Sequence, residues 1–237
     1  RLIRMGERAD CVHVVGAPGL DQLVAMTHKQ SPASELNVAL VVHHASGRTP
    51  AVEARGMSAI LRAVRARGLH AHVLYPNSDR GHSGIIEAIK RAGKTANGDN
   101  RFRVIPSMNR DEYLRCLIDA RVLVGNSSSG IIEAPAAGTP SVNVGARQAG
   151  RLRGGPSVVD AGEAFSDIHD AIGKALKKRP KTAQATPYGD GHSGARTLDA
   201  SLGLVPWTPP TTPIDRSIDR SIAGDIPVLY ESACWRG

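Results

Sequence analysis

The sequence predicts an α/β protein built on a Rossmann-like parallel sheet with helices on both faces. Apolar runs of strand length alternate with stretches of helical periodicity along most of the chain. Residues 38–42, VALVV, are apolar without interruption, which is typical of a strand buried on both faces. Residues 122–144 contain a strand, a short helix and a second strand, joined by a first turn rich in glycine and serine. Together these three observations favour parallel strands connected by helices.

The composition fits an ordinary soluble protein with one large domain or two small ones. Of the 237 residues, 41% are hydrophobic and 22% charged, while aromatic residues make up only 3%. The core must therefore be built from Val, Leu, Ile and Ala. The net charge of +8 raises the possibility of a nucleic-acid partner, but the basic residues are scattered and no aromatic platform accompanies them. A small polyanionic ligand, or an arginine-rich source proteome, explains the charge better.

Cysteine and apolar patterns exclude several classes of protein. The three cysteines form no CxxC pair and their number is odd, so neither a disulfide scaffold nor a zinc site is expected. No signal pattern and no run of 18 apolar residues is present. We therefore expect a cytoplasmic protein with no membrane contact, no metal and no cofactor.

The elements can be predicted in chain order. A strand at 11–15 precedes the segment GAPGLD, which leads into a helix. The helix at 53–67 follows from Met57, Ile60, Leu61 and Val64, which recur at helical spacing before Gly68. Further strands are expected at 38–42, 72–75, 102–105, 122–124, 141–144 and 158–160, and further helices at 83–92, 111–119, 164–178 and 194–202.

Polar residues follow several of these strands. His43 and His44 leave the strand at 38–42, and ligands of open α/β sheets bind beyond the carboxyl ends of strands. A single histidine is usually structural, but a pair that leaves a buried strand is a better candidate for a site, and His43 is assigned to packing or solvent. Asn77 follows the next strand, and with it Asp79, whose default interpretation is an Asx turn or a helix cap, with a catalytic role as the alternative.

The turn at 125–130, GNSSSG, points to a phosphate ligand. Backbone N–H groups at a helix start lack partners inside the helix, and the helix dipole adds positive charge there. Glu133 is expected in the first turn of the following helix, either as a carboxylate that caps the helix or complements its dipole, or as an acceptor for ribose hydroxyls. Arg147, beyond the second strand, could bind a diphosphate or the loop carboxylate, or simply lie on the surface.

The whole stretch is more specific than its turn. GNSSSGIIEAP followed by GTPSVNVGARQAGR resembles the C-terminal lobe of hydrolysing UDP-N-acetylglucosamine 2-epimerases of the sialic-acid-pathway type. The closing GxRQxGR distinguishes these from the non-hydrolysing epimerases. The resemblance extends from about residue 12 to about residue 204. It implies the nucleotide-binding lobe of the two-lobed glycosyltransferase-B architecture.

The resemblance also implies roles for individual residues. His44 corresponds to an active-site histidine that a proline follows in the family, whereas Ala45 follows it here. The segment PNSDRG matches a family motif in which Asn77 would face the nucleotide or sugar, and Met108 would contact uracil through its backbone. The remaining residues expected to bind UDP or substrate are Asn126, Ser127, Ser128, Ser129, Gly130, Glu133 and Arg147.

The implied reaction converts UDP-N-acetylglucosamine and water to N-acetylmannosamine and UDP, by elimination of UDP to a glycal and then addition of water. The base that removes the proton at sugar C2 normally belongs to the family's N-terminal lobe. Three alternatives remain: a hydrolysing epimerase of a bacillosamine-type UDP sugar, a glycosyltransferase, against which the GxRQxGR loop argues, and an inactive or regulatory nucleotide-binding fragment.

The same resemblance suggests a domain organisation. Residues 1–24 are expected to form the crossover from an N-terminal lobe that is missing or is a separate chain, and residues 25–206 the nucleotide-sugar-binding lobe. Residues 207–237 open with a proline-rich stretch, contain the duplicated segment IDRS and have no family counterpart. They are expected to be a disordered or loosely docked tail. The expected partners are a UDP-sugar, the N-terminal lobe and, as a further possibility, a second copy of the chain.

Overall fold

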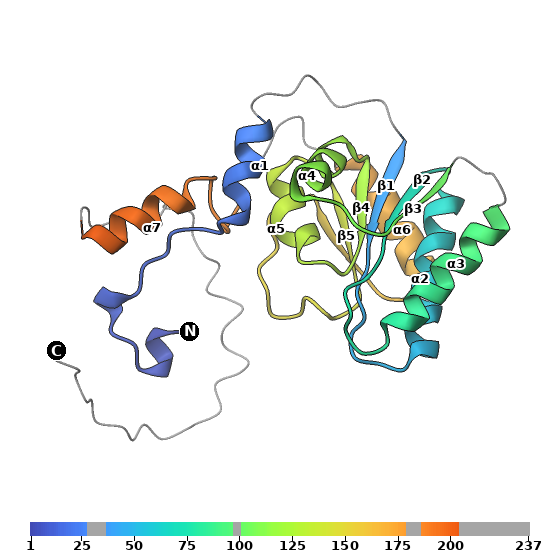
Figure 1. Cartoon of the computed structure of the whole chain (residues 1–237), viewed down its shortest axis with the longest axis horizontal. Helices are drawn as coiled ribbons and strands as arrows, with labels where there is room; N and C mark the ends of the chain where they lie inside the picture. Colours follow the sequence, from blue (N-terminus) through green and yellow to red (C-terminus); the bar gives the residue numbers. More distant parts are fainter. Residues whose placement is uncertain (28–36, 97–100, 179–185, 204–237) are drawn as a thin grey trace.

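The computed structural model describes residues 1–27, 37–96, 101–178 and 186–203. It confirms the predicted α/β fold, with one sheet of six parallel strands in the order β3-β2-β1-β4-β5-β6 among the described residues (Figure 1). The strands are β1 (Val38–Val42), β2 (His70–Leu74), β3 (Phe102–Ile105), β4 (Val122–Gly125), β5 (Ser141–Val144) and β6 (Val158–Ala161).

The strand order places a topological switch point between β1 and β4. The chain runs outward from β1 through β2 to β3, returns to β4 on the other side of β1, and then continues outward through β5 to β6. Because the connections leave β1 and β4 in opposite directions, a crevice opens beyond the carboxyl ends of these two strands. The last register pair, Val42 and Gly125, marks that position.

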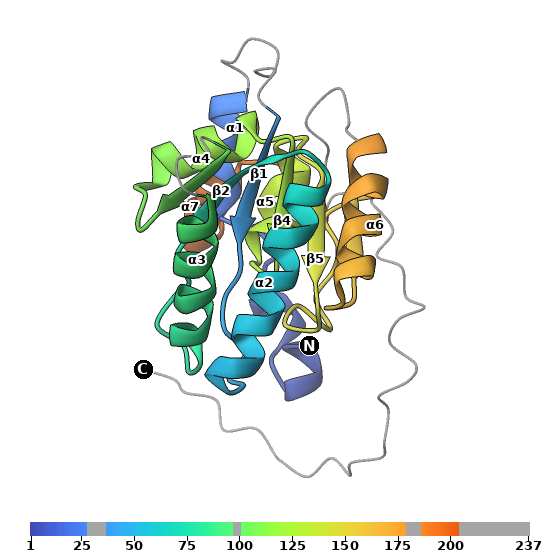
Figure 2. The ribbon, with the colours of Figure 1, turned by 90° about the vertical axis from the view of Figure 1, so that its right-hand side faces the viewer.

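Helices cover both faces of the sheet. On one face lie α2 (Pro50–Ala66), α3 (His82–Ala96) and α6 (Phe165–Lys177), which stand in front of the strands in Figure 2. The other face carries α4 (Arg110–Asp119) and α5 (Ser129–Ala136), with α1 (Gly19–Thr27) packed against α5.

The position of β1, covered by helices on both faces of the sheet, explains why its sequence is apolar at every position. Ala39 and Val41 belong to the core cluster on the face of α2, α3 and α6, whereas Leu40 and Val42 belong to the cluster on the face of α4 and α5. Successive side chains of a strand point to opposite faces, so a strand covered on both sides is apolar throughout.

The predicted helices form with small changes at their ends. The helix expected at 53–67 begins earlier, at Pro50, where the fixed φ of proline suits the first helical position. Its predicted apolar face, including Met57, Ile60 and Val64, is buried. Helix α4 begins with a capping box in which Asn109 and Glu112 bond each other's backbone N–H, which the sequence analysis did not predict.

The strand predicted at 11–15 is wrong. Ala9–Cys11 is a short 3-10 turn, and the residues after it adopt no regular structure up to α1. Val14 is 61% exposed, so this segment does not enter the sheet. Its alternating apolar residues are typical of a strand, but a strand also needs a hydrogen-bonding neighbour, and none lies beside it in the described chain.

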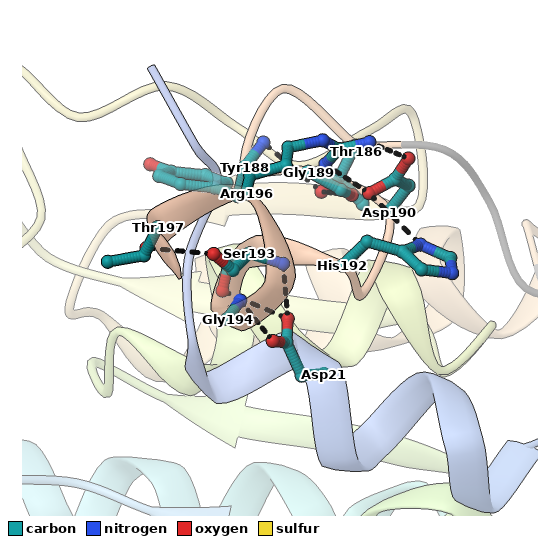
Figure 3. A network of polar contacts seen from close by, with 10 residues as sticks. All are labelled: Asp21, Thr186, Tyr188, Gly189, Asp190, His192, Ser193, Gly194, Arg196 and Thr197. Atoms are coloured by element: carbon teal, nitrogen blue, oxygen red, sulfur yellow. Dashed lines mark hydrogen bonds and ion pairs between the residues drawn. The ribbon is translucent and has the colours of Figure 1, made fainter. Parts of the chain in front are cut away.

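Helix α1 meets the start of α7 (Ser193–Leu202), as Figure 3 shows. Asp21 of α1 accepts hydrogen bonds from the backbone N–H groups of Ser193 and Gly194 at the start of α7. The backbone N–H of Ala17 donates to the carbonyl of Tyr188 at 2.7 Å. The domain boundaries predicted at residues 24 and 206 remain predictions, and the tail at 207–237 lies outside the described residues.

Candidate functional site

Asn126 joins the two loops that diverge at the switch point. Its side-chain Oδ1 accepts a hydrogen bond from the backbone N–H of His44 at 2.7 Å, and its Nδ2 donates to the carbonyl of His44 at 2.8 Å. The asparagine is only 1% exposed. Two bonds from one buried amide fix the position and the rotation of the His44 peptide units, so the histidine enters the crevice in a defined orientation.

A glycine makes this approach possible. Gly125 has a φ of +147°, and a Cβ atom at this position would lie 2.0 Å from the carbonyl oxygen of Val42. No side chain fits there without separating β4 from β1. The first glycine of the predicted phosphate-binding turn is therefore required for the junction of the two strands.

His44 is half-buried and is held as a neutral imidazole. Its Nδ1 accepts a hydrogen bond from the backbone N–H of Asn77 at 3.2 Å, which leaves the proton on Nε2. Burial, and next the positive charge of Arg147, lower the pKa of His44 below its usual value, while Asp79 opposes the shift. The histidine can therefore donate one hydrogen bond to a ligand at neutral pH.

The end of β2 and the loop after β5 meet beside His44. Asn77 donates from Nδ2 to the carboxylate of Asp79 at 2.7 Å, and the same carboxylate lies 3.8 Å from the guanidinium of Arg147. Arg147 also donates to the carbonyl of Asn126 at 3.4 Å. The structure thus brings His44, Asn77, Asn126 and Arg147 together, and it adds Asp79, whose default interpretation from sequence was a turn or cap.

The serine turn uses part of its donors internally. The hydroxyl of Ser127 accepts the backbone N–H of Ser129, and Tyr113 of α4 donates to the hydroxyl of Ser129. Ser128 is the most exposed of the three serines. In the part of the chain that the structure describes, the backbone N–H groups of Ser127 and Ser128 have no internal acceptor. These two groups remain available to an anion at the start of α5.

Of the two remaining candidates, Gly130 is tightly packed, whereas Met108 lies in a loop. Gly130 packs closely, because a Cβ atom there would lie 3.1 Å from Leu123, and its carbonyl accepts a hydrogen bond from Ser141. Met108 is half-buried in the loop between β3 and α4. No hydrogen bond joins it to the other candidate residues within the described ranges.

Glu133 lies one turn later than the sequence predicted. Helix α5 begins at Ser129, so Glu133 is in the second turn, too far along the helix to cap it. Its side chain is 13% exposed and forms an ion pair with Arg110, the first residue of α4. The capping interpretation is therefore wrong, and the carboxylate faces the space between α5, α4 and α1.

The loop that carries Arg147 is held by Gln148, from the GARQAGR motif, and by Arg153, which the sequence did not point to. Gln148 is 2% exposed and donates to the carbonyl of Asn126 at 2.8 Å. Arg153 donates to both carboxylate oxygens of Asp160 and to the carbonyl of Gln148. Burial raises the pKa of Asp160, but the bonds from Arg153 and Asn143 outweigh it and leave the pKa below its usual value. No sequence pattern distinguishes Arg153 from the other arginines nearby.

A cavity of about 210 Å³ lies away from these residues, at the amino ends of β2 and β3 between α2 and α3. It is lined by Leu61, Arg62, Arg65, Leu69, Ala71, Ala92, Thr95, Arg101 and Phe102. The candidate site therefore rests on convergent polar groups at the switch point and not on a cavity.

Comparison with known proteins decides the family. The family model described as UDP-N-acetylglucosamine 2-epimerase matches residues 1–201 of this sequence. The chain belongs to the UDP-N-acetylglucosamine 2-epimerase family. The UDP-N,N'-diacetylbacillosamine 2-epimerase (hydrolyzing) of Legionella pneumophila is 34% identical over 206 residues, which are 83% of this chain and 52% of that protein. The UDP-N-acetylglucosamine 2-epimerase of Neisseria meningitidis is 29% identical over 74% of this chain and 47% of its own length.

Solved structures agree on the fold. The Neisseria meningitidis epimerase bound to UDP-GlcNAc superimposes with a TM-score of 0.64 at 14% identity, over 85% of this chain and 58% of that one. The Methanocaldococcus jannaschii epimerase in complex with UDP-GlcNAc and UDP gives 0.63 at 15% identity, over 85% and 57%. This epimerase-family chain spans about half the length of the curated relatives it matches.

Two further findings concern this family member's described residues. No group of three His, Cys, Asp or Glu side chains there is placed to hold a metal ion. None of the helices within the described ranges has both the length and the apolarity that crossing a bilayer requires.

Proposed function

We propose that this chain is the C-terminal, UDP-binding lobe of a cytoplasmic hydrolysing UDP-N-acetylglucosamine 2-epimerase that serves sialic acid or related nonulosonate synthesis. The observation that carries the proposal is the junction of His44 and Asn126 at the switch point, with Arg147 against the same backbone carbonyl. The GARQAGR loop and the hydrolysing relative from Legionella pneumophila support the hydrolysing subtype.

Each group of the site has a defined role in this proposal. The departing UDP accumulates negative charge on its diphosphate, which the N–H groups of Ser127 and Ser128 and the guanidinium of Arg147 would stabilise. His44 would donate from Nε2 to the diphosphate or to a sugar hydroxyl. Glu133 would accept the ribose hydroxyls, and the backbone near Met108 would contact the uracil.

The elimination step also requires a base that removes the proton at sugar C2. In this chain the carboxylates near the site are Asp79 and Glu133, and each faces an arginine. Both carboxylates are thus already engaged by a guanidinium group. We propose that the base comes from an N-terminal lobe, so that the chain alone binds UDP but releases no N-acetylmannosamine.

A bacillosamine-type UDP sugar is the second candidate substrate, favoured by the relative from Legionella pneumophila, which is a UDP-N,N'-diacetylbacillosamine 2-epimerase. Incubation of the complete two-lobed enzyme with each UDP sugar, followed by product analysis, separates the two. A regulatory fragment would bind UDP but release no sugar when combined with its lobe.

Calorimetric titration of the purified chain with UDP tests the nucleotide site directly. We expect saturable binding that Arg147→Ala and Glu133→Ala each weaken by about tenfold or more, since each removes a charge-assisted hydrogen bond. Arg91→Ala, which removes an exposed arginine of α3, should leave binding unchanged. Failure of the folded wild-type chain to bind UDP would refute the proposal for this chain.

A further inference from the structure

Arg110 connects three segments around the carboxylate of Glu133. It is the first residue of α4, placed there by the capping box at Asn109 and Glu112. One of its terminal nitrogens donates both to Oε1 of Glu133 and, at 2.8 Å, to the carbonyl of Gly19 at the start of α1. A single guanidinium nitrogen thus holds α1, α4 and α5 at one point.

The two oxygens of Glu133 are not equivalent as a result. Oε1 is held by Arg110 and lies against Gly19, where a Cβ atom would come within 3.5 Å of it. For Oε2, no protein donor is present in the described part of the chain. The side chain is 13% exposed, so Arg110 fixes one oxygen and leaves the other without a donor among the described residues.

Helix α4 also contacts the start of α5. Tyr113, one turn after Arg110, donates its hydroxyl to Ser129 at the first position of α5. The guanidinium of Arg110 lies 6.0 Å from the centre of the Tyr113 ring, so the two side chains pack together. The first turn of α4 therefore positions both the start of α5, next to the proposed diphosphate, and Glu133, next to the proposed ribose.

We infer that Arg110 is a positioning residue that determines selectivity for ribonucleotides over 2'-deoxyribonucleotides. By binding Oε1 it orients Glu133 so that Oε2 accepts hydrogen bonds from the vicinal hydroxyls of a ribose. A carboxylate offers two acceptor oxygens, so with Oε1 bound to Arg110 the other oxygen selects ligands with hydroxyl donors. This inference rests on the proposed UDP site.

Binding of UDP and 2'-deoxy-UDP to matched variants tests this role. We expect the wild-type chain to prefer UDP by about tenfold, the difference expected for one hydrogen bond to a charged group. In Arg110→Met, UDP affinity should fall by about tenfold while the affinity for 2'-deoxy-UDP changes less, so the preference approaches one. Arg110→Lys keeps the charge but not the fork geometry, and it should retain part of the preference.

Combining the substitutions of Arg110 and Glu133 provides a measurement that a purely structural role of Arg110 would not affect. Glu133→Gln should also remove the preference for UDP, and combining it with Arg110→Met should reduce the preference no further, because both residues act through one carboxylate. Arg91→Met, which breaks the exposed pair with Glu87 on α3, serves as the matched arginine control and should keep the wild-type preference.

The outcomes separate this inference from the proposed function. If Arg110→Met and Arg110→Lys both keep the wild-type ratio of UDP to 2'-deoxy-UDP affinity while Arg147→Ala weakens both ligands, only the inference is overturned. If the folded wild-type chain binds neither nucleotide, the proposed function is overturned and the inference with it. A lost preference in the folded Arg110 variants, absent from the Arg91 control, supports the inference.

Discussion

At the scale of single residues, the role of Asn126 requires both the oxygen and the nitrogen of its side-chain amide. Oδ1 accepts from the backbone of His44 and Nδ2 donates to it. In Asn126→Asp the second bond becomes a contact between two acceptors in a buried site. We expect the free energy of unfolding to fall by about 1–3 kcal/mol, measured by urea denaturation, with weaker UDP binding as a second effect.

The matched control for that substitution is Asn37→Asp. Asn37 also donates its side-chain amide to a backbone carbonyl, that of Gly68, but it is exposed, so water can replace the bond. Its effect should stay within about 0.5 kcal/mol. Equal destabilisation by the two substitutions would contradict the role assigned to Asn126.

His43 makes a different prediction, about pH. The residue is 3% exposed, neither ring nitrogen has a hydrogen-bond partner among the described residues, and burial lowers the pKa of His43 to about 4. The charges of Glu53 and Glu163 oppose this shift, while His44 and Arg48 add to it. Because the folded pKa lies below the unfolded value of about 6.5, the unfolded state takes up the proton first. The contribution of neutral His43 to stability is therefore complete above about pH 6.5 and is lost as the pH falls towards 4.

The expected loss of unfolding free energy between pH 7 and pH 4.5 is about 2 kcal/mol. Urea denaturation at pH 7 and pH 4.5 measures it, and His43→Leu should lose clearly less stability between these two values than the wild type. Residual loss in this variant comes from the other titrating groups. His192→Leu removes an exposed histidine and should keep the wild-type dependence. A dependence that His43→Leu leaves unchanged would show that His43 is not the group responsible.

The residue types of the site were predictable from sequence, but their partners were not. Asn77, Asn126 and Arg147 follow strands or lie in a specific motif, and the structure brings them together around His44. Arg110 and Glu133 are 23 residues apart and meet only because α4 and α5 pack side by side. Arg153 and Asp160 carry no local signal for the loop that they hold.

At the scale of elements, two glycines of α3 should respond oppositely to the same change. A Cβ atom at Gly84 would lie 1.8 Å from the carbonyl oxygen of Pro50, where α3 packs on the start of α2. Gly84→Ala should therefore force the helices apart and cost about 1–3 kcal/mol of unfolding free energy. At Gly93 the nearest atom, on Phe102, is 3.5 Å away, so Gly93→Ala should stabilise the helix by about 0.5–1 kcal/mol.

Thermal and urea denaturation of the two variants measure this difference. Both substitutions add one methyl group to the same helix, so the contact made at each position accounts for most of the difference between them. Equal shifts in the two variants would mean that α2 and α3 do not pack through Gly84.

Element prediction succeeded where burial leaves a periodic pattern. The uninterrupted apolar run of β1 and the helical spacing of Met57, Ile60 and Val64 both follow from what covers them. It failed at residues 11–15, because alternation reports the preference of a segment but not whether a neighbouring strand exists. It also misplaced Glu133 by one turn, because three consecutive serines do not show which of them begins the helix.

At the scale of the whole molecule, the first and last α-helices of the described chain, α1 and α7, are in contact (Figure 3). Residues 172 positions apart meet when Asp21 accepts the backbone N–H and the hydroxyl of Ser193. Burial raises the pKa of Asp21, but the bonds from Gly194 and Ser193 outweigh it and lower the pKa overall. A carboxylate on one helix thus acts as the N-terminal cap of another, a relation that no local sequence motif encodes.

Loss of this cap should loosen α7 without destabilising the sheet. In Asp21→Ala the first amides of α7 lose their acceptor, whereas β1, β4 and their helices keep all their contacts. We expect hydrogen exchange, followed by mass spectrometry, to accelerate by about tenfold or more in peptides that cover α7. Peptides from the sheet should exchange at the wild-type rate. Asp10→Ala, which removes an exposed carboxylate paired with Arg8, is the control and should change neither region. Unchanged exchange in α7 would show that other contacts hold it, whereas faster exchange throughout the chain would show that the terminal helices and the sheet unfold as one unit.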